Sequence, residues 1–314
     1  TSLICASRYE TMARKQNFRF SIMLNKSSFL FLVFLWFASP VFAANQIVVV
    51  KISGAINPAV AEFVSQEIHQ ANKEQQALIV LNMDTPGGLD TSMRQIIKKI
   101  QSSHVPVASY VSPSGSRAAS AGTFITIASH IAAMAPGTNI GAAHPVNMMG
   151  GNNEQESTMD KKVVNDAAAY IRSLAELRNR NSHWAELAVV KSVSISAEEA
   201  KRLNVIDLIA GNVKALTLAI DGREIQTASG PMTLKTGRLE IVYHEMSPRL
   251  KMLDIISNPN VAYVLMMIGV VGLYFEMSNP GLVFPGVIGA VSMVLAFYAM
   301  QTLPIDYAGL LLVL

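Results

Sequence analysis

The sequence predicts an α/β domain with a mostly parallel sheet, followed by a helical membrane region. Two observations carry this prediction. Between residues 44 and 258, short apolar strands alternate with helices, which is typical of a parallel sheet covered by helices. Beyond that point the chain is almost continuously apolar, with no charged residue between Glu276 and Asp306. We therefore expect three segments: 1–43, 44–258 and 259–314.

The first segment has the parts of a secretory signal. Lys26 precedes an unbroken apolar run at 29–38, and small residues lead to an expected cleavage after Ala43. The run is short for a bilayer span, and an uncleaved anchor is the alternative. Met23 is a more natural start than Thr1, so we expect residues 1–22 to lie upstream of the translated chain.

Composition and charge exclude several classes of protein. The chain is 51% hydrophobic and only 15% charged, whereas ordinary soluble domains carry about 25% charged residues. Five basic residues and one acidic residue lie in 1–43, so the rest of the chain has a net charge of −1 within a total of +3. The charge distribution therefore gives no indication of a basic surface that would bind nucleic acid. Cys5 is the single cysteine and no histidines have paired ligand spacing, so we expect no disulfide, metal or cofactor.

The middle segment alternates between the two kinds of element. We expect strands at 47–52, 77–83, 107–111 and 131–134, and helices at 58–75, from 89 to 101, and from about 119. An amphipathic helix follows from Val164 to Ala175, and a capping box opens another at 196–199. Residues 223–244 resemble a β-hairpin with its turn at Ser229-Gly230.

Three apolar runs make up the last segment: Val261–Phe275, Gly281–Tyr298 and Tyr307–Leu314. They predict short membrane helices linked as hairpins, with a buried soluble hairpin as the alternative. The connecting loops carry no Lys or Arg, and Arg249 and Lys251 before the first run mildly oppose an outside location. The signal outweighs these two charges, so we expect residues 44–258 to lie outside the cytoplasm.

Two loops at expected strand ends could carry chemistry. Gly87 and Gly88 stand in an Asp-Thr-Pro-Gly-Gly turn before a helix, where bare N–H groups suit a developing oxyanion. A plain strand-to-helix turn explains the same residues. Ser120 lies among small residues at an expected helix start, where the helix dipole favours negative charge on its oxygen. A serine at that position is also a common helix N-cap.

A nucleophilic serine needs a base, and the sequence offers two kinds. Lys161 and Lys162 lie at the start of the amphipathic helix, and a lysine becomes a base when desolvation lowers its pKa. His144 lies before Pro145, and imidazole needs less adjustment. The alternatives are a solvated helix start for the lysines and a turn for the histidine.

Four motifs in order resemble the NfeD family of membrane-bound, Clp-class serine proteases: Asp84–Gly88, Arg117–Thr123, Met134–Pro145 and Ala169–Ala175. The resemblance covers about residue 45 to the end. It implies a Clp/crotonase-like protease domain of repeated β-α-β units, followed by α-helical transmembrane segments. It also implies a serine–lysine dyad that cleaves hydrophobic segments of stomatin-like membrane proteins.

The resemblance assigns roles to particular residues. The nucleophile falls on Ser120, and the oxyanion hole on Gly87 and Gly88 with the Ala121 N–H. The family's lysine lies seven residues before the Ala of the Ala-Tyr-Ile motif, which is Lys162, although the helical pattern puts Lys161 nearer the apolar face. Related Clp peptidases use a histidine at nearly the spacing of His144, so a Ser120–His144 pair is the rival.

The resemblance also implies an environment for the protein. We expect a multi-pass protein of the inner or cytoplasmic membrane with an extracytoplasmic protease domain, assembled as a homodimer or larger. Full-length members carry more membrane helices and a small β-barrel, so we expect this chain to be a fragment. Two rival functions remain: a non-proteolytic scaffold that binds a stomatin-like partner, and a crotonase-type acyl-CoA enzyme.

Overall fold

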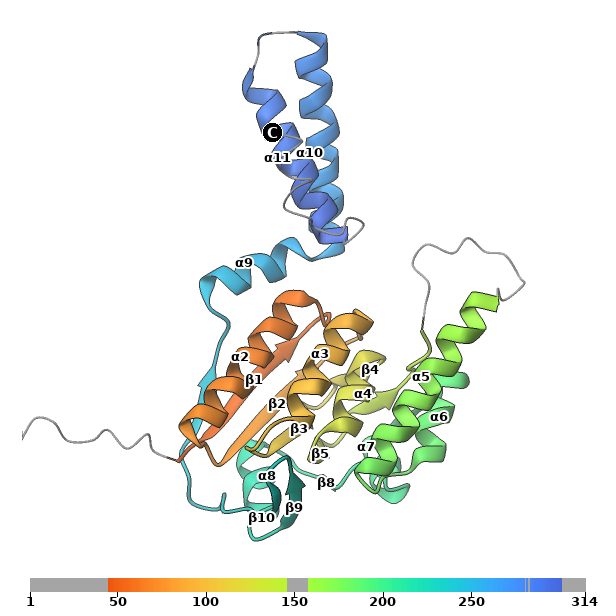
Figure 1. The fold of residues 1–314 in the computed structure, drawn as a ribbon, viewed down its shortest axis with the longest axis vertical. Helices are drawn as coiled ribbons and strands as arrows, with labels where there is room; N and C mark the ends of the chain where they lie inside the picture. The colour runs from red at the N-terminus through yellow and green to blue at the C-terminus, as the bar shows by residue number, and fades with distance from the viewer. Residues whose placement is uncertain (1–44, 146–157, 280, 282, 301–314) are drawn as a thin grey trace, which may run out of the picture. The chain divides into compact units, whose positions relative to one another are not determined.

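The structure is a computed structural model that describes residues 45–145, 158–279, 281 and 283–300. The expected signal, its cleavage site, the start at Met23 and the third apolar run lie outside these residues. Within them, a parallel sheet with helices on both faces is followed by a pair of apolar helices (Figure 1).

Six parallel strands form the main sheet, in the order β11-β1-β2-β3-β5-β8. Their bounds are β1 (Ile47–Ser53), β2 (Leu78–Asp84), β3 (Val107–Val111), β5 (Ile131–Met134), β8 (Leu208–Ile209) and β11 (Ile241–His244). The central strands are buried on both faces, which explains why their sequences are runs of apolar residues without alternation.

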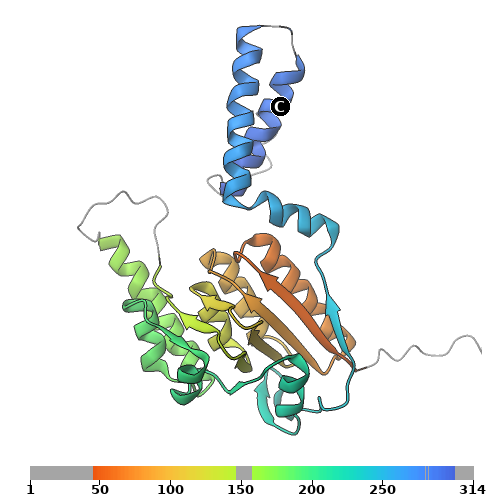
Figure 2. The same ribbon diagram turned by 180° about the vertical axis from the view of Figure 1, so that it is seen from behind.

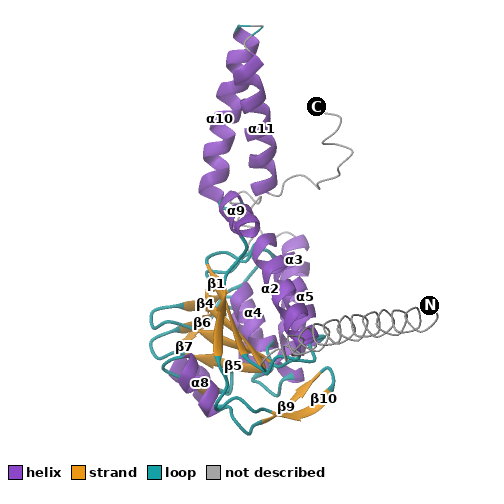
Figure 3. Ribbon diagram, turned by 90° about the vertical axis from the view of Figure 1, so that its left-hand side faces the viewer, coloured by secondary structure: helices purple, strands orange, loops and turns teal. Residues whose placement is uncertain are grey.

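The sheet divides the core into two layers, and helices cover each of them (Figure 3). Side chains on one face of the sheet pack against four helices: α2 (Pro58–Glu74), α3 (Asp90–Gln101), α4 (Ala121–Ala128) and α5 (Thr158–Leu177). Those on the other face pack against α8 (Val213–Ala219), which Figure 2 shows from that side. Along β1, Val48 and Val50 belong to the first layer and Ile47 and Val49 to the second, as the pleat requires.

A small second sheet stands beside the end of β2. It consists of β4 (Arg117–Ala119), β6 (Asn139–Gly141) and β7 (Ser194–Ser196). The helices α6 (Ser182–Val190) and α7 (Ala197–Arg202) flank β7, and the predicted capping box at Ser196 opens α7. A bridge between Thr85 and Ala118 joins this sheet to the chain that leaves β2. The polypeptide between β4 and α4 is therefore held next to the Gly-Gly turn.

The predicted hairpin over 223–244 is right in its first half and wrong in its second. β9 (Glu224–Thr227) and β10 (Gly230–Thr233) pair antiparallel around the predicted turn. β11 does not return to them but runs parallel to β1, with Ile241 opposite Ile47. Its apolar residues are compatible with either a hairpin strand or a parallel edge strand. The long-range pairing with β1 determines that it is an edge strand.

Three helices follow the sheet: α9 (Pro248–Ile256), α10 (Pro259–Ser278) and α11 (Val283–Met300). Among the described residues, one helix, Asn260–Ser278, is long and apolar enough to cross a membrane, and Val283–Ala299 is a shorter apolar helix. The pair packs through glycines, since a Cβ added to Gly289 would lie 2.7 Å from the Leu273 nitrogen. Small residues of this kind let membrane helices approach closely.

Candidate active site

Ser120 occupies a strained turn between β4 and α4. Its φ is 51° and its ψ is −117°, a conformation that a non-glycine residue rarely adopts. Its N–H donates to the Gly141 carbonyl over 3.0 Å, and its own carbonyl accepts from the Thr123 N–H. Such strain clusters at functional sites, and a sharp strand-to-helix turn is a known way to present a nucleophilic oxygen.

The helix-capping explanation for Ser120 does not hold. It stands at the N-cap position of α4, but its side chain makes no capping hydrogen bond. Asn57, Asn181, Ser196 and Asn212 all cap their helices with side-chain oxygens. The Ser120 hydroxyl is therefore not engaged in capping α4.

Positions 87 and 88 each exclude a side chain, for different steric reasons. A Cβ at Gly87 would lie 2.6 Å from the Ser120 Cβ and 3.1 Å from its Oγ, and the φ of Gly87 is +121°. A Cβ at Gly88 would lie 2.2 Å from the Ile56 carbonyl oxygen. A plain turn would not need both residues to be bare, so Gly87 is a glycine because Ser120 approaches it.

Two backbone N–H groups remain available beside the serine. In the part of the chain that the structure describes, neither the Gly88 N–H nor the Ala121 N–H has a hydrogen-bond acceptor. The neighbouring groups are used: the Ile56 N–H donates to the Gly87 carbonyl and the Leu89 N–H to the Ile56 carbonyl. This pairing turns the Gly88 N–H away from Ile56.

Two buried threonines, which the sequence analysis missed, lock these loops together. The Thr85 hydroxyl accepts from the Gly87 N–H over 3.0 Å, and the Thr85 carbonyl accepts from the Ala119 N–H. The Thr123 hydroxyl lies 2.9 Å from the Gly141 carbonyl oxygen. Both threonines are fully buried. A polar residue within each motif was the only signal, and it does not distinguish a positioning role from an ordinary turn.

The two candidate lysines lie near the start of α5. Lys161 and Lys162 are in the first turns of α5, and both are exposed. Burial is what favours a neutral amine, and neither lysine is buried in the single chain. Lys162 precedes Asp166 by four residues and therefore lies on the same side of the helix. Asp166 faces α3, because its carboxylate lies 2.6 Å from Arg94.

Arg94 joins α3 to α5 above the buried layer. Its Nε donates to both Asp90 oxygens, at 3.1 and 2.9 Å, while its Nη2 donates to Asp166. Its guanidinium also lies 4.3 Å from the centre of the Tyr170 ring, which stacks on Phe124 at 6.1 Å. We call these five residues the Arg94 cluster. Phe124 follows Ser120 by one helical turn. The cluster therefore connects α3, which follows the Gly-Gly turn, α4, which follows Ser120, and α5, which carries the two lysines.

His144 has its own fixed partner. Its Nδ1 lies 2.9 Å from the Val189 carbonyl oxygen. A carbonyl only accepts, so Nδ1 is the donor, and in the neutral tautomer with this bond Nε2 carries the lone pair. The ring is half-buried, three residues beyond the Gly141 that contacts Ser120. No described carboxylate bonds to it, so the third member of a Clp-like triad is absent from the described residues.

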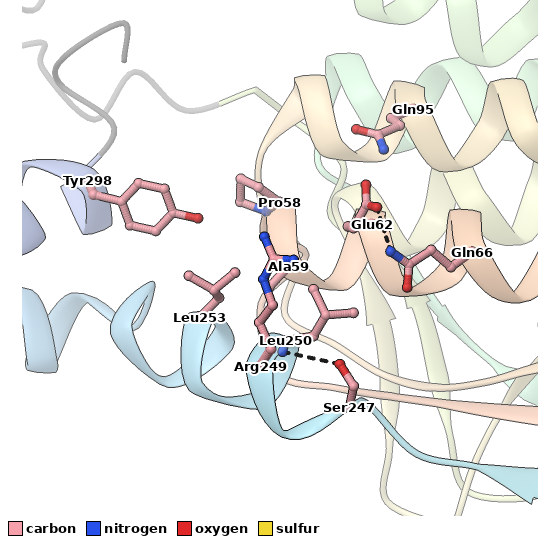
Figure 4. Close-up of a pocket in the computed structure, with 10 residues that line it drawn as sticks. All are labelled: Pro58, Ala59, Glu62, Gln66, Gln95, Ser247, Arg249, Leu250, Leu253 and Tyr298. Carbon is pink, nitrogen blue, oxygen red and sulfur yellow. Dashed lines mark hydrogen bonds between the residues drawn. The ribbon is translucent and has the colours of Figure 1, made fainter. Parts of the chain in front are cut away.

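A cavity of about 470 Å³ lies away from this site, between the first turns of α2 and the helix α9 (Figure 4). Its lining includes Glu62, Arg249 and Leu253, and none of the candidate site residues. Among the described residues there is also no group of three or more His, Cys, Asp or Glu side chains that could hold a metal ion.

These features define a class of protein: a parallel α/β domain with a strained, uncapped serine against paired glycines, joined to apolar helices. Residues 46–222 match the family described as NfeD1b, N-terminal domain, and residues 260–314 match the NfeD integral membrane domain. The chain belongs to the NfeD family of membrane-bound proteins.

Two curated relatives are similar over most of the chain. It is 35% identical over 287 residues to the membrane-bound protease PH1510 of Pyrococcus horikoshii, covering 90% of this chain and 64% of the relative. It is 28% identical over 282 residues to the membrane protein NfeD1b of Bacillus subtilis, covering 86% and 61%. The chain therefore spans somewhat less than two thirds of the length of these relatives.

Two solved structures show the same fold. One is a lysine-to-alanine variant of a membrane-bound stomatin-specific protease in complex with a substrate peptide. Its TM-score is 0.62 at 34% identity, covering 68% of this chain and 98% of that one. The other is a serine-to-alanine variant of the same protease, with a TM-score of 0.61 at 35% identity, covering 65% and 99%. The predicted α/β fold class and the family are confirmed.

Proposed function

We propose that the protein is a membrane-bound serine endopeptidase in which Ser120 is the nucleophile and Lys162 the general base. The observation that carries the proposal is Ser120 itself, which is strained, uncapped and pressed against Gly87. A protease of similar fold has been studied as variants that lack a serine and a lysine. This supports a dyad of the same two residue types here.

The proposed roles imply the following reaction. Neutral Lys162 takes the proton from the Ser120 hydroxyl as Oγ bonds to the substrate's carbonyl carbon. The Gly88 and Ala121 N–H groups stabilise the oxyanion, and each such donor is worth about 10²- to 10³-fold in rate. The lysine ammonium then protonates the departing amine. Water, deprotonated by the same lysine, releases the acyl group and restores Ser120.

The arguments for the two lysines disagree, and the apolar pattern of the helix also puts Lys161 nearer the buried face. The two replaced residues of the structural relative are 41 positions apart, and the same spacing from Ser120 leads to Lys161. The Ala-Tyr-Ile motif and the side of α5 that carries Asp166 favour Lys162. We prefer Lys162, because segment length between the residues varies more readily than a helical register.

The exposure of both lysines suggests how the site is completed. A bound apolar peptide or a second copy of the chain would exclude water from Lys162 and so favour its neutral form. We propose a homo-oligomer, dimer or larger, that cleaves apolar segments of stomatin-like membrane proteins. We also propose a multi-pass topology in the inner or cytoplasmic membrane. The boundaries 44–258 and 259–314 then separate an extracytoplasmic protease domain from its membrane helices.

The test is cleavage of apolar peptides by the full chain in nanodiscs. We expect Ser120→Ala and Lys162→Ala each to lower kcat at least 10³-fold. The matched controls are Ser114→Ala, at an exposed serine in the loop before β4, and Lys161→Ala, and both should stay within about threefold. Circular dichroism of every variant separates loss of chemistry from loss of fold.

The other outcomes identify the rivals. Loss with His144→Ala and survival with Lys162→Ala would move the base to the imidazole, whose Nε2 is free to accept a proton. Loss with Lys161→Ala alone would move it by one residue. A folded wild-type chain that cleaves no apolar peptide, alone or with a stomatin-like protein, would favour the scaffold.

A further inference from the structure

Helix α9 has two apolar sides, and only one is covered by protein. Leu250 is buried in the core and Leu253 packs against it. On the other side, Met252 and Ile255 are three residues apart and are 59% and 57% exposed. Nothing in the described chain therefore covers the second side.

The connection to the membrane limits where α9 can lie. Two residues, Ser257 and Asn258, separate the end of α9 from the start of α10. Three extended peptide units reach at most about 11 Å. The polar layer on each side of a bilayer core is about 5–8 Å thick. The span begins at Asn260, one helical residue beyond the start of α10, so the end of α9 lies in that layer or within about 5 Å of it.

We propose that α9 is an interfacial helix that rests on the bilayer surface, with Met252 and Ile255 inserted at the boundary between headgroups and acyl chains. Lys251 is exposed, and the ion pair described for it is a long one, 3.8 Å, to the still more exposed Glu245. Its ammonium is thus free to reach lipid phosphates while its stem lies along the apolar surface. Apolar residues on one side and a cation beside them are typical of helices that lie in the interface plane.

The same helix is tied to the candidate active site through two residues. The Asp254 carboxylate accepts from the Asn57 side-chain amide over 2.7 Å. Asn57 follows Ile56, whose backbone exchanges hydrogen bonds with Gly87 and Leu89. The seated helix therefore holds the edge of the sheet that carries the Gly-Gly turn toward the bilayer.

The test measures the depth of α9 in the full chain, reconstituted in phosphatidylglycerol–phosphatidylcholine nanodiscs. Cys5 is replaced by serine, and single cysteines are introduced as Met252→Cys and Ile255→Cys for spin labelling. Leu218→Cys on α8, 54% exposed on the other face of the sheet, is the aqueous control. Val264→Cys on α10, 52% exposed, is the lipid control.

We expect labels at 252 and 255 to collide with oxygen several-fold more often than with a water-soluble nickel complex, as at 264. Nickel accessibility equal to that at 218 would overturn the proposal. Protection from both reagents would also overturn it, because a second copy or another membrane helix would then cover this side. The readout is independent of peptide cleavage, so it stands or falls apart from the proposed function.

Discussion

The two halves of the candidate site are built differently. The serine half is buried and cross-linked by backbone hydrogen bonds, whereas the lysine half is an exposed helix start. Every residue of α4 is buried, and Thr85 and Thr123 tie its start to two other loops. Lys161 and Lys162 have no comparable enclosure.

The same contrast divides α5 along its length. Beyond its C-terminal end, Arg178 and Arg180 donate to carbonyls of α4, with Arg180 only 7% exposed and paired to Asp207 at 2.6 Å. Near its lysine end, α5 is linked to α3 by the half-exposed Arg94 cluster. Under the proposed mechanism, the oxyanion donors are preorganised in the folded chain, whereas the lysine base requires substrate or a partner to exclude water from it.

The largest expected effect comes from filling the serine half. Gly87→Ala places a Cβ 2.6 Å from the Ser120 Cβ at a φ of +121°. We expect kcat to fall at least 100-fold, because the serine or the Gly88 donor must move. The measurement is peptide cleavage by the full chain, with thermal unfolding recorded alongside.

Gly222→Ala is the matched control. Gly222 also has a positive φ, +76°, but a Cβ there meets nothing within 4 Å. Its substitution should cost about 1 kcal/mol in stability through backbone strain and leave kcat unchanged. Equal activity losses in both variants would mean that strain, and not the approach to Ser120, explains Gly87.

The serine half should also be the acid-sensitive one. His130 lies just beyond α4, and burial, together with the nearby Arg178 charge, lowers its pKa to about 3. The unfolded chain would bind this proton near pH 6.5, so stability is complete above pH 6.5 and declines as pH falls toward 3. At pH 5 we expect the free energy of unfolding to be lower by about 2 kcal/mol.

Chemical unfolding of residues 45–258 at pH 7 and pH 5 measures this loss. His130→Gln keeps an acceptor for the Val107 N–H, which now donates to the imidazole Nδ1, and should remove most of the pH dependence. His183→Gln, at an exposed position, should leave it unchanged. If the free energy of unfolding of His130→Gln depends on pH as strongly as that of the wild type, other groups cause the acid sensitivity.

These differences indicate what a sequence can predict here. The strand and helix pattern predicts the parallel sheet. The small residues around Ser120 predict a loop that another segment can approach closely, and Gly87 does so. The positive φ of Ser120 and the bonds of Thr85 depend on loops far apart in sequence, so local patterns do not contain them. The parallel pairing of β11 has the same cause. Lys162 is exposed in the single chain, and no local pattern encodes what a substrate or a second copy would place over it.

The smallest expected effect tests the lysine half. Arg94→Met removes the planar guanidinium, which donates hydrogen bonds to both Asp90 and Asp166. It also removes the positive charge over the Tyr170 ring. Exposed ion pairs contribute about 0–1 kcal/mol each, so stability should change by less than about 2 kcal/mol. We expect kcat to fall about tenfold at unchanged KM, because the lysine end of α5 would be held in place for a smaller fraction of the time.

Arg172→Met is the control, since Arg172 pairs with Glu186 at 3.1 Å on another side of the same helix and should not alter kcat. Arg94→Lys should recover part of the loss, because an ammonium keeps one contact but not the planar fork. Salt gives a second readout, since screening weakens exposed pairs. Raising ionic strength should lower kcat in the wild type and not in Arg94→Met. A parallel decline in both would show that the Arg94 cluster does not position the lysine.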